Sequence, residues 1–166
     1  MQTLEMAFLQ SAIKRLGYYK ELGERTFLQL NEADFHFLPN EESNSIAIII
    51  QHMSGNMLSR WTDFLTTDGE KEWRKRDEEF EVLPASKHEL IDLWNQGWNC
   101  CLNAIESLSG EDLLKTITIR GEILTVVDAI NRQLAHYPYH VGQIIYIGKL
   151  VKNRDWQNLS MPRNRK

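Results

Sequence analysis

The sequence predicts an all-α protein built as a four-helix bundle, with a small β-hairpin before the last helix. Four long segments repeat apolar residues at helical spacing, and residues that favour helix starts precede the later ones. One short stretch alternates apolar and polar residues instead, as a strand does. The chain has 166 residues, the length of one domain, and we expect residues 1–166 to form it.

The first helix is expected roughly from Thr3 to Leu30. Gly17 and Gly23 lie within it, and their low helix propensity argues against a straight helix. A loop is expected over residues 31–44. The residues predicted to face inward are Leu4, Phe8, Ala12, Leu16, Tyr19, Phe27 and Leu30.

The second helix is expected from Ile46 to about Phe64. Asn44 or Ser43 can cap it, because their short side chains accept hydrogen bonds from free backbone N–H groups. Its apolar face is predicted to comprise Ile46, Ile49, Ile50, Met53, Met57, Trp61 and Phe64.

Residues 70–81 mix acidic and basic side chains. This composition is typical of a solvated connection, here held to the body by Trp73 and Phe80. The stretch is also long enough to cover one end of a bundle, where Arg74, Arg76 or Asp77 could face a ligand.

A capping box of Ser86 and Glu89 opens the third long helix, and Ser109-Gly110 ends it. The apolar face of this helix is predicted to include Leu90, Trp94, Cys101, Ile105 and Leu108. Residues 115–119 then alternate as a strand, and residues 120–122 turn the chain into Ile123-Leu124, which predicts the hairpin.

The last helix is expected from Thr125 to Val151, with Thr125 and Asp128 at its start. Pro138 lies well inside it, removes a backbone hydrogen bond and should kink or bulge the helix. The predicted core face consists of Val126, Val127, Ile130, Leu134, Tyr137, Val141, Ile144 and Ile145.

Charge and cysteine content exclude several classes of protein. The net charge of −4 and pI near 5.7 argue against nucleic acid as a partner, and the short basic tail from Arg163 to Lys166 is expected to be solvated. No run of residues is long and apolar enough to cross a bilayer, and the N-terminus lacks the features of a secretion signal. The two cysteines, Cys100 and Cys101, are adjacent and form no disulfide framework. We therefore expect a cytoplasmic protein without a membrane partner.

Histidine spacing indicates a metal site. His136 and His140 are four residues apart, so they share one face of the last helix with Gln143 and can chelate one cation. His52 is the best candidate for a third ligand, since it falls on the flank of the second helix beside Asn56. Spacing alone leaves open a simpler interpretation, in which these histidines are polar flank residues with ordinary hydrogen-bond partners or solvent contact.

A histidine in the second helix followed by His-x-x-x-His-x-x-Gln in the fourth resembles the DinB/YfiT-like metalloprotein superfamily. The resemblance covers nearly the whole chain. The stretches 51–56 (Gln-His-Met-Ser-Gly-Asn), 68–70 (Asp-Gly-Glu) and 132–143 look closest to a small bacterial subgroup of undefined function.

This resemblance implies three histidines at one mouth of the bundle, holding a divalent metal, often zinc or nickel, with open positions for water. The matching residues are His52, His136 and His140. Characterised relatives include S-transferases and isomerases that use low-molecular-weight thiols, so the resemblance implies a small-molecule substrate and a thiol as partner. Gln143 and Asn56 are expected to face the substrate or support the ligands. Relatives often dimerise, and the many large aromatic residues, among them Trp61, Trp94 and Trp98, also favour a homodimer.

Three functions remain open from the sequence. The chain can be a metal-dependent enzyme, either a thiol S-transferase or a hydrolase of a small substrate. It can be a non-catalytic metal-binding or stress-related protein, or an interaction domain whose histidines only pack. Metalloprotease chemistry is disfavoured, because residues 137–139 are Tyr-Pro-Tyr and supply no glutamate base between the histidines.

Overall fold

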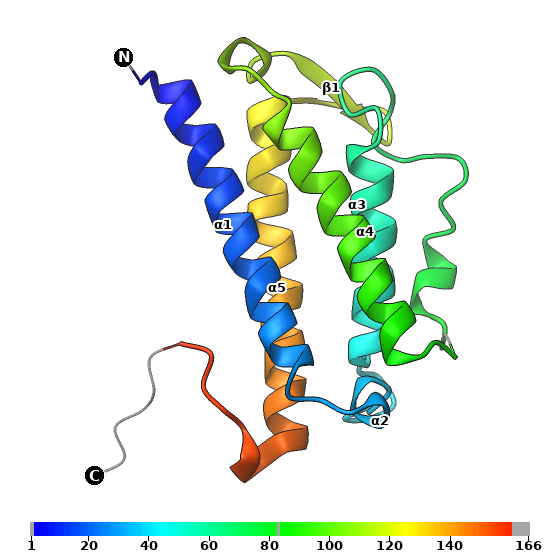
Figure 1. Cartoon of the computed structure of the whole chain (residues 1–166). Helices are drawn as coiled ribbons and strands as arrows, with labels where there is room; N and C mark the ends of the chain where they lie inside the picture. Colours follow the sequence, from blue (N-terminus) through cyan, green and yellow to red (C-terminus); the bar gives the residue numbers. More distant parts are fainter. Residues whose placement is uncertain (1, 83, 161–166) are drawn as a thin grey trace.

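The protein is mostly helical, with one small antiparallel sheet. The computed structural model describes residues 2–82 and 84–160, so the basic tail from Arg163 to Lys166 lies outside the described residues. Four long helices run side by side in the described part of the chain (Figure 1). They are α1 (Leu4–Phe27), α3 (Ile46–Trp61), α4 (Lys87–Glu106) and α5 (Val126–Lys152). No helix among the described residues is long and apolar enough to span a membrane.

The long helices pack mainly in two pairs. Helix α3 lies chiefly against α4, and α1 lies chiefly against α5, whereas α3 and α5 share fewer contacts. The predicted apolar faces of α3 and α5 are buried or half-buried along their length, which confirms the helical spacing read from the sequence. Because α3 and α5 are the less tightly joined neighbours, polar side chains on their flanks have room between them.

Aromatic side chains join the two pairs of helices. Phe27 of α1 lies 5.1 Å from Trp94 of α4, Trp94 lies 5.5 Å from Trp98, and Trp98 lies 5.6 Å from Tyr137 of α5, as measured between ring centroids. All three contacts are edge-on, a favourable arrangement for aromatic rings. Trp61 is also buried. The core therefore contains the three tryptophans that the sequence analysis took to favour a homodimer, so they provide no argument for one.

Several expected boundaries are wrong in detail. Helix α1 is continuous through both glycines and ends at Phe27 rather than Leu30. Its expected core residue Leu4 is 82% exposed. The expected loop contains a one-turn helix, α2 (Glu32–Phe35), which begins at a capping box made by Asn31 and Asp34. Ser45, rather than either expected residue, caps α3.

The hairpin and the start of the last helix agree with the sequence analysis. Strand β1 (Thr116–Ile119) pairs antiparallel with β2 (Glu122–Thr125), and Thr125 then caps α5 by accepting from the Asp128 backbone N–H. The helical assignment of α5 continues through Pro138. The capping box of Ser86 and Glu89 also opens α4 as predicted.

The connection between α3 and α4 is not simply a solvated segment. Trp73, expected to hold it to the body, is 57% exposed, whereas Arg74 and Glu79 are buried. The short 3-10 helix η1 (Asp77–Phe80) packs on α3, and the connection runs along the outside of that helix (Figure 1). Burial of two charged residues in this place indicates a structural or functional role for the connection.

Two glycines of α1 test how tightly α1 packs on α4. A Cβ at position 23 would collide with the Trp94 ring, whereas a Cβ at position 17 would meet no atom within 4 Å. We expect Gly23→Ala to lower the free energy of unfolding by about 1–3 kcal/mol through overpacking. Gly17→Ala should raise it by up to about 1 kcal/mol through helix propensity. Urea denaturation of both variants measures the difference, and equal effects would contradict the packing described above.

Candidate metal centre

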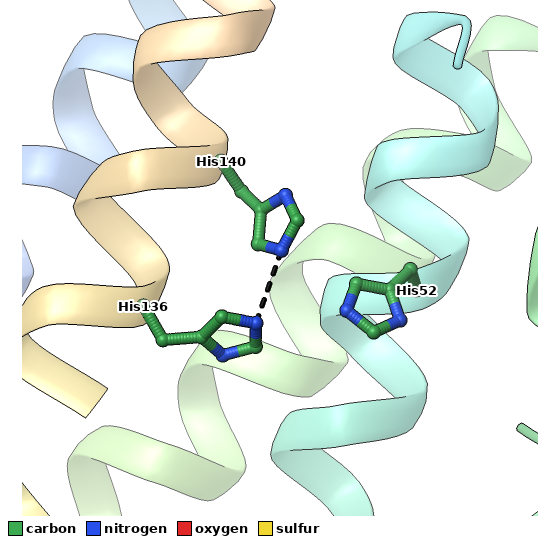
Figure 2. Close-up of side chains that lie close together, drawn as sticks. All are labelled: His52, His136 and His140. Atoms are coloured by element: carbon green, nitrogen blue, oxygen red, sulfur yellow. Dashed lines mark hydrogen bonds between the residues drawn. The ribbon is translucent and has the colours of Figure 1, made fainter. Parts of the chain in front are cut away.

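Three histidines converge between α3 and α5 (Figure 2). His52 comes from α3, and His136 and His140 come from successive turns of α5. One ring nitrogen of each lies within 4.8 Å of those of the other two. Among residues 2–82 and 84–160, this is the one group of three or more histidine, cysteine or acidic residues with metal-ligand spacing. The structure thus brings together the three residues singled out in the sequence, midway along the two helices rather than at their ends.

Each imidazole is oriented by an oxygen atom at its Nδ1. The Nδ1 of His52 lies 2.9 Å from Oε2 of Glu79, and the Nδ1 of His140 lies 2.8 Å from Oε1 of Gln143. The Nδ1 of His136 is 3.3 Å from Oε1 of Gln133. An acceptor at Nδ1 favours the tautomer that carries its proton there, which leaves Nε2 with a free lone pair. All three Nε2 atoms are then available as ligands.

The Nε2 atoms of His136 and His140 face each other at 3.0 Å (Figure 2). When both rings donate from Nδ1, two lone pairs point toward the same small space and repel each other. A cation in that space would convert the repulsion into coordination. The donor set of three imidazoles is also one that Zn²⁺ and Ni²⁺ accept. The residues present therefore fit a divalent metal ion.

Burial keeps the histidines of α5 neutral. It lowers the pKa of His136 to about 3, with further lowering by the neighbouring His140 and His52. Burial also lowers the pKa of His140, against the opposing effect of its hydrogen bond with Gln143. Neutral imidazole is the form that binds a metal, so no proton has to leave these rings at neutral pH.

Glu79 ties the connection between α3 and α4 to the site. Although burial raises its pKa, hydrogen bonds from Arg74 and His52 lower it, so the carboxylate is ionised. Arg74 donates to both carboxylate oxygens, from Nε at 2.7 Å and from Nη2 at 2.8 Å. Gly55 makes this arrangement possible, because a Cβ at that position would overlap the Glu79 carboxylate. Phe80 covers the His52 ring at a centroid distance of 4.8 Å.

The sequence analysis named three of the residues around the histidines and missed one. Gln143 lies against His140, as expected from its position one helical turn further on. Asn56 is buried and accepts a hydrogen bond from the Tyr137 hydroxyl, which in turn accepts from Trp61 Nε1. The sequence analysis considered Arg74 as a ligand-facing residue and missed Glu79. The only signal for Glu79 was its place in a charged connection that also contained aromatic residues.

A cavity of about 250 Å³ adjoins the histidines. Its lining is entirely polar or charged and consists of His52, Asn56, Arg60, Arg74, Arg76, Arg120, Arg132, Gln133 and His136. A larger hollow of about 940 Å³ lies between the start of α1 and the 3-10 helix η2 (Gly110–Asp112), but it is mainly apolar and contains no histidine. Of these two cavities, the one beside the histidines has the polar groups suited to chemistry.

Fold and site together define a helical protein with a three-histidine cluster in which two side chains are buried and one is half-buried. Residues 3–165 match the family described as "Protein of unknown function (DUF1572)", and the chain belongs to this family. A crystal structure of a conserved protein from Enterococcus faecalis has a similar fold, with a TM-score of 0.67 and 19% sequence identity. The similarity covers 87% of this chain and 96% of that one. No match was found among curated proteins.

The role of Glu79 can be tested with a neighbouring residue as control. Glu79→Ala removes the acceptor that orients His52, and we expect metal affinity to fall about 10–100-fold, as for other partners of ligating histidines. Glu78→Ala changes an exposed residue of the same short helix and should leave the affinity unchanged. Competition with a chromophoric chelator measures both affinities.

Because Glu79→Ala also leaves Arg74 buried without its main partner, Glu79→Gln serves as a second variant. Its amide oxygen can still accept from His52, so its metal affinity should lie between those of the wild type and Glu79→Ala. Nitrogen-15 NMR of the histidine rings reports the tautomer directly. A His52 ring that carries its proton on Nε2 in the wild-type protein would contradict the proposed orientation.

Proposed function

We propose that the protein binds a divalent metal ion, zinc or nickel, through His52, His136 and His140, and that it is a metal-dependent enzyme acting on a small molecule. The observation that carries this proposal is the convergence of three Nε2 atoms whose Nδ1 atoms are each hydrogen-bonded to a side-chain oxygen. A structural zinc site usually has four protein ligands, whereas three leave a position for an exchangeable ligand.

The adjoining cavity favours an enzyme over a non-catalytic metal-binding protein. It reaches His52 and His136 and is lined by polar groups that can orient a substrate. When bound, a divalent cation would lower the pKa of a water or thiol ligand and so supply a nucleophile near neutral pH. The chain's own residues orient the imidazoles, keep those of α5 neutral and shield one side of the site through Phe80. The reactions we propose are transfer of a low-molecular-weight thiol or hydrolysis of a small substrate.

The proposed architecture is a four-helix bundle of the DinB/YfiT-like type, located in the cytoplasm. The four long helices lying side by side and the similarity to the Enterococcus faecalis protein support the bundle. Adjacent cysteines without a disulfide suit a reducing compartment. Cys101 is buried, as the sequence predicted, and burial raises the pKa of its thiol, so it is not a candidate nucleophile.

Substitution of each histidine tests the metal site. His52→Ala, His136→Ala and His140→Ala should each lose most bound metal, because two imidazoles hold a cation far more weakly than three. The protein should stay folded, since none of the three side chains belongs to the apolar core. His88→Ala, whose side chain is 85% exposed on α4, is the matched control and should keep its metal.

Metal content by elemental analysis and thermal unfolding should be measured for all four variants. Full occupancy in every histidine variant would refute the three-histidine site. Metal retained together with a fourth protein ligand in its coordination sphere would support a structural site and remove the argument for catalysis.

A homodimer remains a prediction that rests on the resemblance alone, because the core accounts for the tryptophans. Light scattering at micromolar concentration is expected to give twice the monomer mass of 19.5 kDa. A mass near the monomer value would contradict it.

A further inference from the structure

The cavity beside the histidines contains an unusual concentration of positive charge. Five of the chain's ten arginines line it, although the chain as a whole has a net charge of −4. No carboxylate belongs to the described lining. Arginine forks match the geometry of carboxylate and phosphate groups, and walls of one charge sign concentrate ligands of the other sign.

Two of the arginines are buried and fixed in place. Arg74 is held by Glu79 at hydrogen-bond distance, and Arg60 donates from Nη1 to the Gly69 backbone carbonyl at 2.9 Å. Glu70 lies 3.3 Å from Arg74 but 3.7 Å from Arg60, so its pairing with Arg60 is loose. Burial lowers the pKa of Arg60, and the charges of Arg74 and Arg132 lower it further against the effect of Glu70. Positive charge at the floor of the cavity is thus only partly balanced.

The other three arginines are at the rim and are about half exposed. Arg120 lies 3.1 Å from Glu70, a carboxylate it shares with both buried arginines. Arg132 of α5 has only a distant partner, Glu122 at 3.9 Å. The Arg76 guanidinium lies over the Phe80 ring and 3.6 Å from the exposed carboxylate of Asp77. Ion pairs of such exposed arginines contribute little to stability, so these guanidinium groups can exchange their present partners for another anion.

The position of Arg120 is built into the fold. Asp68, in the connection after α3, accepts hydrogen bonds from the backbone N–H groups of Arg120 and Gly121 in the hairpin turn, both at 2.9 Å. The hairpin is thereby attached to the connection that also carries Arg74 and Glu79. These bonds and that of the Glu70 backbone lower the pKa of Asp68 to about 2, so the attachment persists in mild acid.

Asn56 adds an uncharged hydrogen-bond donor to the lining of the cavity. Its Oδ1 accepts from Tyr137, which leaves the amide nitrogen Nδ2 to donate to a ligand. The cavity therefore offers donors from α3, α5, the connection and the hairpin turn around a space next to two of the three histidines.

We propose that this cavity binds an oxyanionic group of the substrate, a carboxylate or a phosphate, directly beside the three-histidine site. The reaction of the bound substrate rests on the proposed function, whereas binding of the anion itself depends only on the arginines. Arg60, Arg74 and Asn56 form the floor of the anion site, and Arg120 and Arg132 close over it from the rim.

The test compares two double variants that remove the same charge. In Arg120→Gln/Arg132→Gln both changes are at the cavity rim, where the side chains are 51% and 47% exposed. In the control, Arg15→Gln/Arg25→Gln, both changes are on α1, away from the cavity. Inorganic phosphate and acetate are titrated into the full chain by calorimetry at low ionic strength, with the protein either chelator-treated or reloaded with Zn²⁺. Metal content is measured separately in every sample.

We expect phosphate or acetate to bind the wild-type protein and the control with similar affinity. Binding to the rim variant should be weaker by about tenfold or more, because charge-assisted arginine contacts are lost. The difference in anion affinity between the rim variant and the control should persist in the chelator-treated protein. Whichever of phosphate and acetate binds more tightly indicates whether the substrate carries a phosphate or a carboxylate. Equal affinities of the two double variants would overturn the inference. So would anion binding that disappears on chelation and does not depend on the rim arginines, since the metal alone would then hold the anion.

The two proposals fail in distinguishable ways. Arginine-dependent phosphate binding by a chain that never takes up metal would leave the anion site standing and refute the metal-dependent enzyme. Stable metal binding together with an anion affinity that is the same in all variants would refute the anion site and leave the proposed metal site unaffected.

Discussion

The hydrogen-bonded chain from Arg74 through Glu79 to His52 is the constraint on which the site depends. A carboxylate buried against a helix is costly unless it is ionised and paired, and here Arg74 supplies two charge-assisted hydrogen bonds. The same carboxylate occupies the Nδ1 of His52 and so directs the opposite ring nitrogen toward α5. Gly55 allows the approach because it has no side chain in the way. One interaction thus sets both the conformation of the connection between α3 and α4 and the tautomer of His52.

The helices alone would not make this site. Helices α3 and α5 are each anchored more firmly to another partner, α4 and α1 respectively, so the space between α3 and α5 can hold polar groups. That space is lined by the segment between α3 and α4 and by the hairpin turn, which Asp68 joins to each other. The segments outside the long helices therefore form part of the candidate site, while the aromatic core holds the helices in position.

The proposed cation site adjoins five arginines, which would give a bound cation an electrostatic cost. Like charges repel, and the repulsion is stronger in a partly buried cavity than in water. Glu79 neutralises Arg74, and the imidazoles of α5 are uncharged. An anion placed between the metal and the remaining arginines would offset the rest of the repulsion. Cation and anion would then each favour binding of the other, as reciprocal linkage requires.

The sequence by itself determined the long helices, most of their inward faces, the hairpin and the three histidines. These features depend on local rules, namely the period of apolar residues, the capping residues at helix starts and the spacing of side chains along one helix face. Only the tertiary structure decided that Glu79 meets His52, that the connection carrying Arg74 lies along α3, and that arginines from four segments share one cavity. Such contacts join residues up to tens of positions apart, and the charged sequence of the connection is equally compatible with a solvated segment. Its conformation is selected by a buried ion pair and by the space above Gly55, which exist only after the helices have packed.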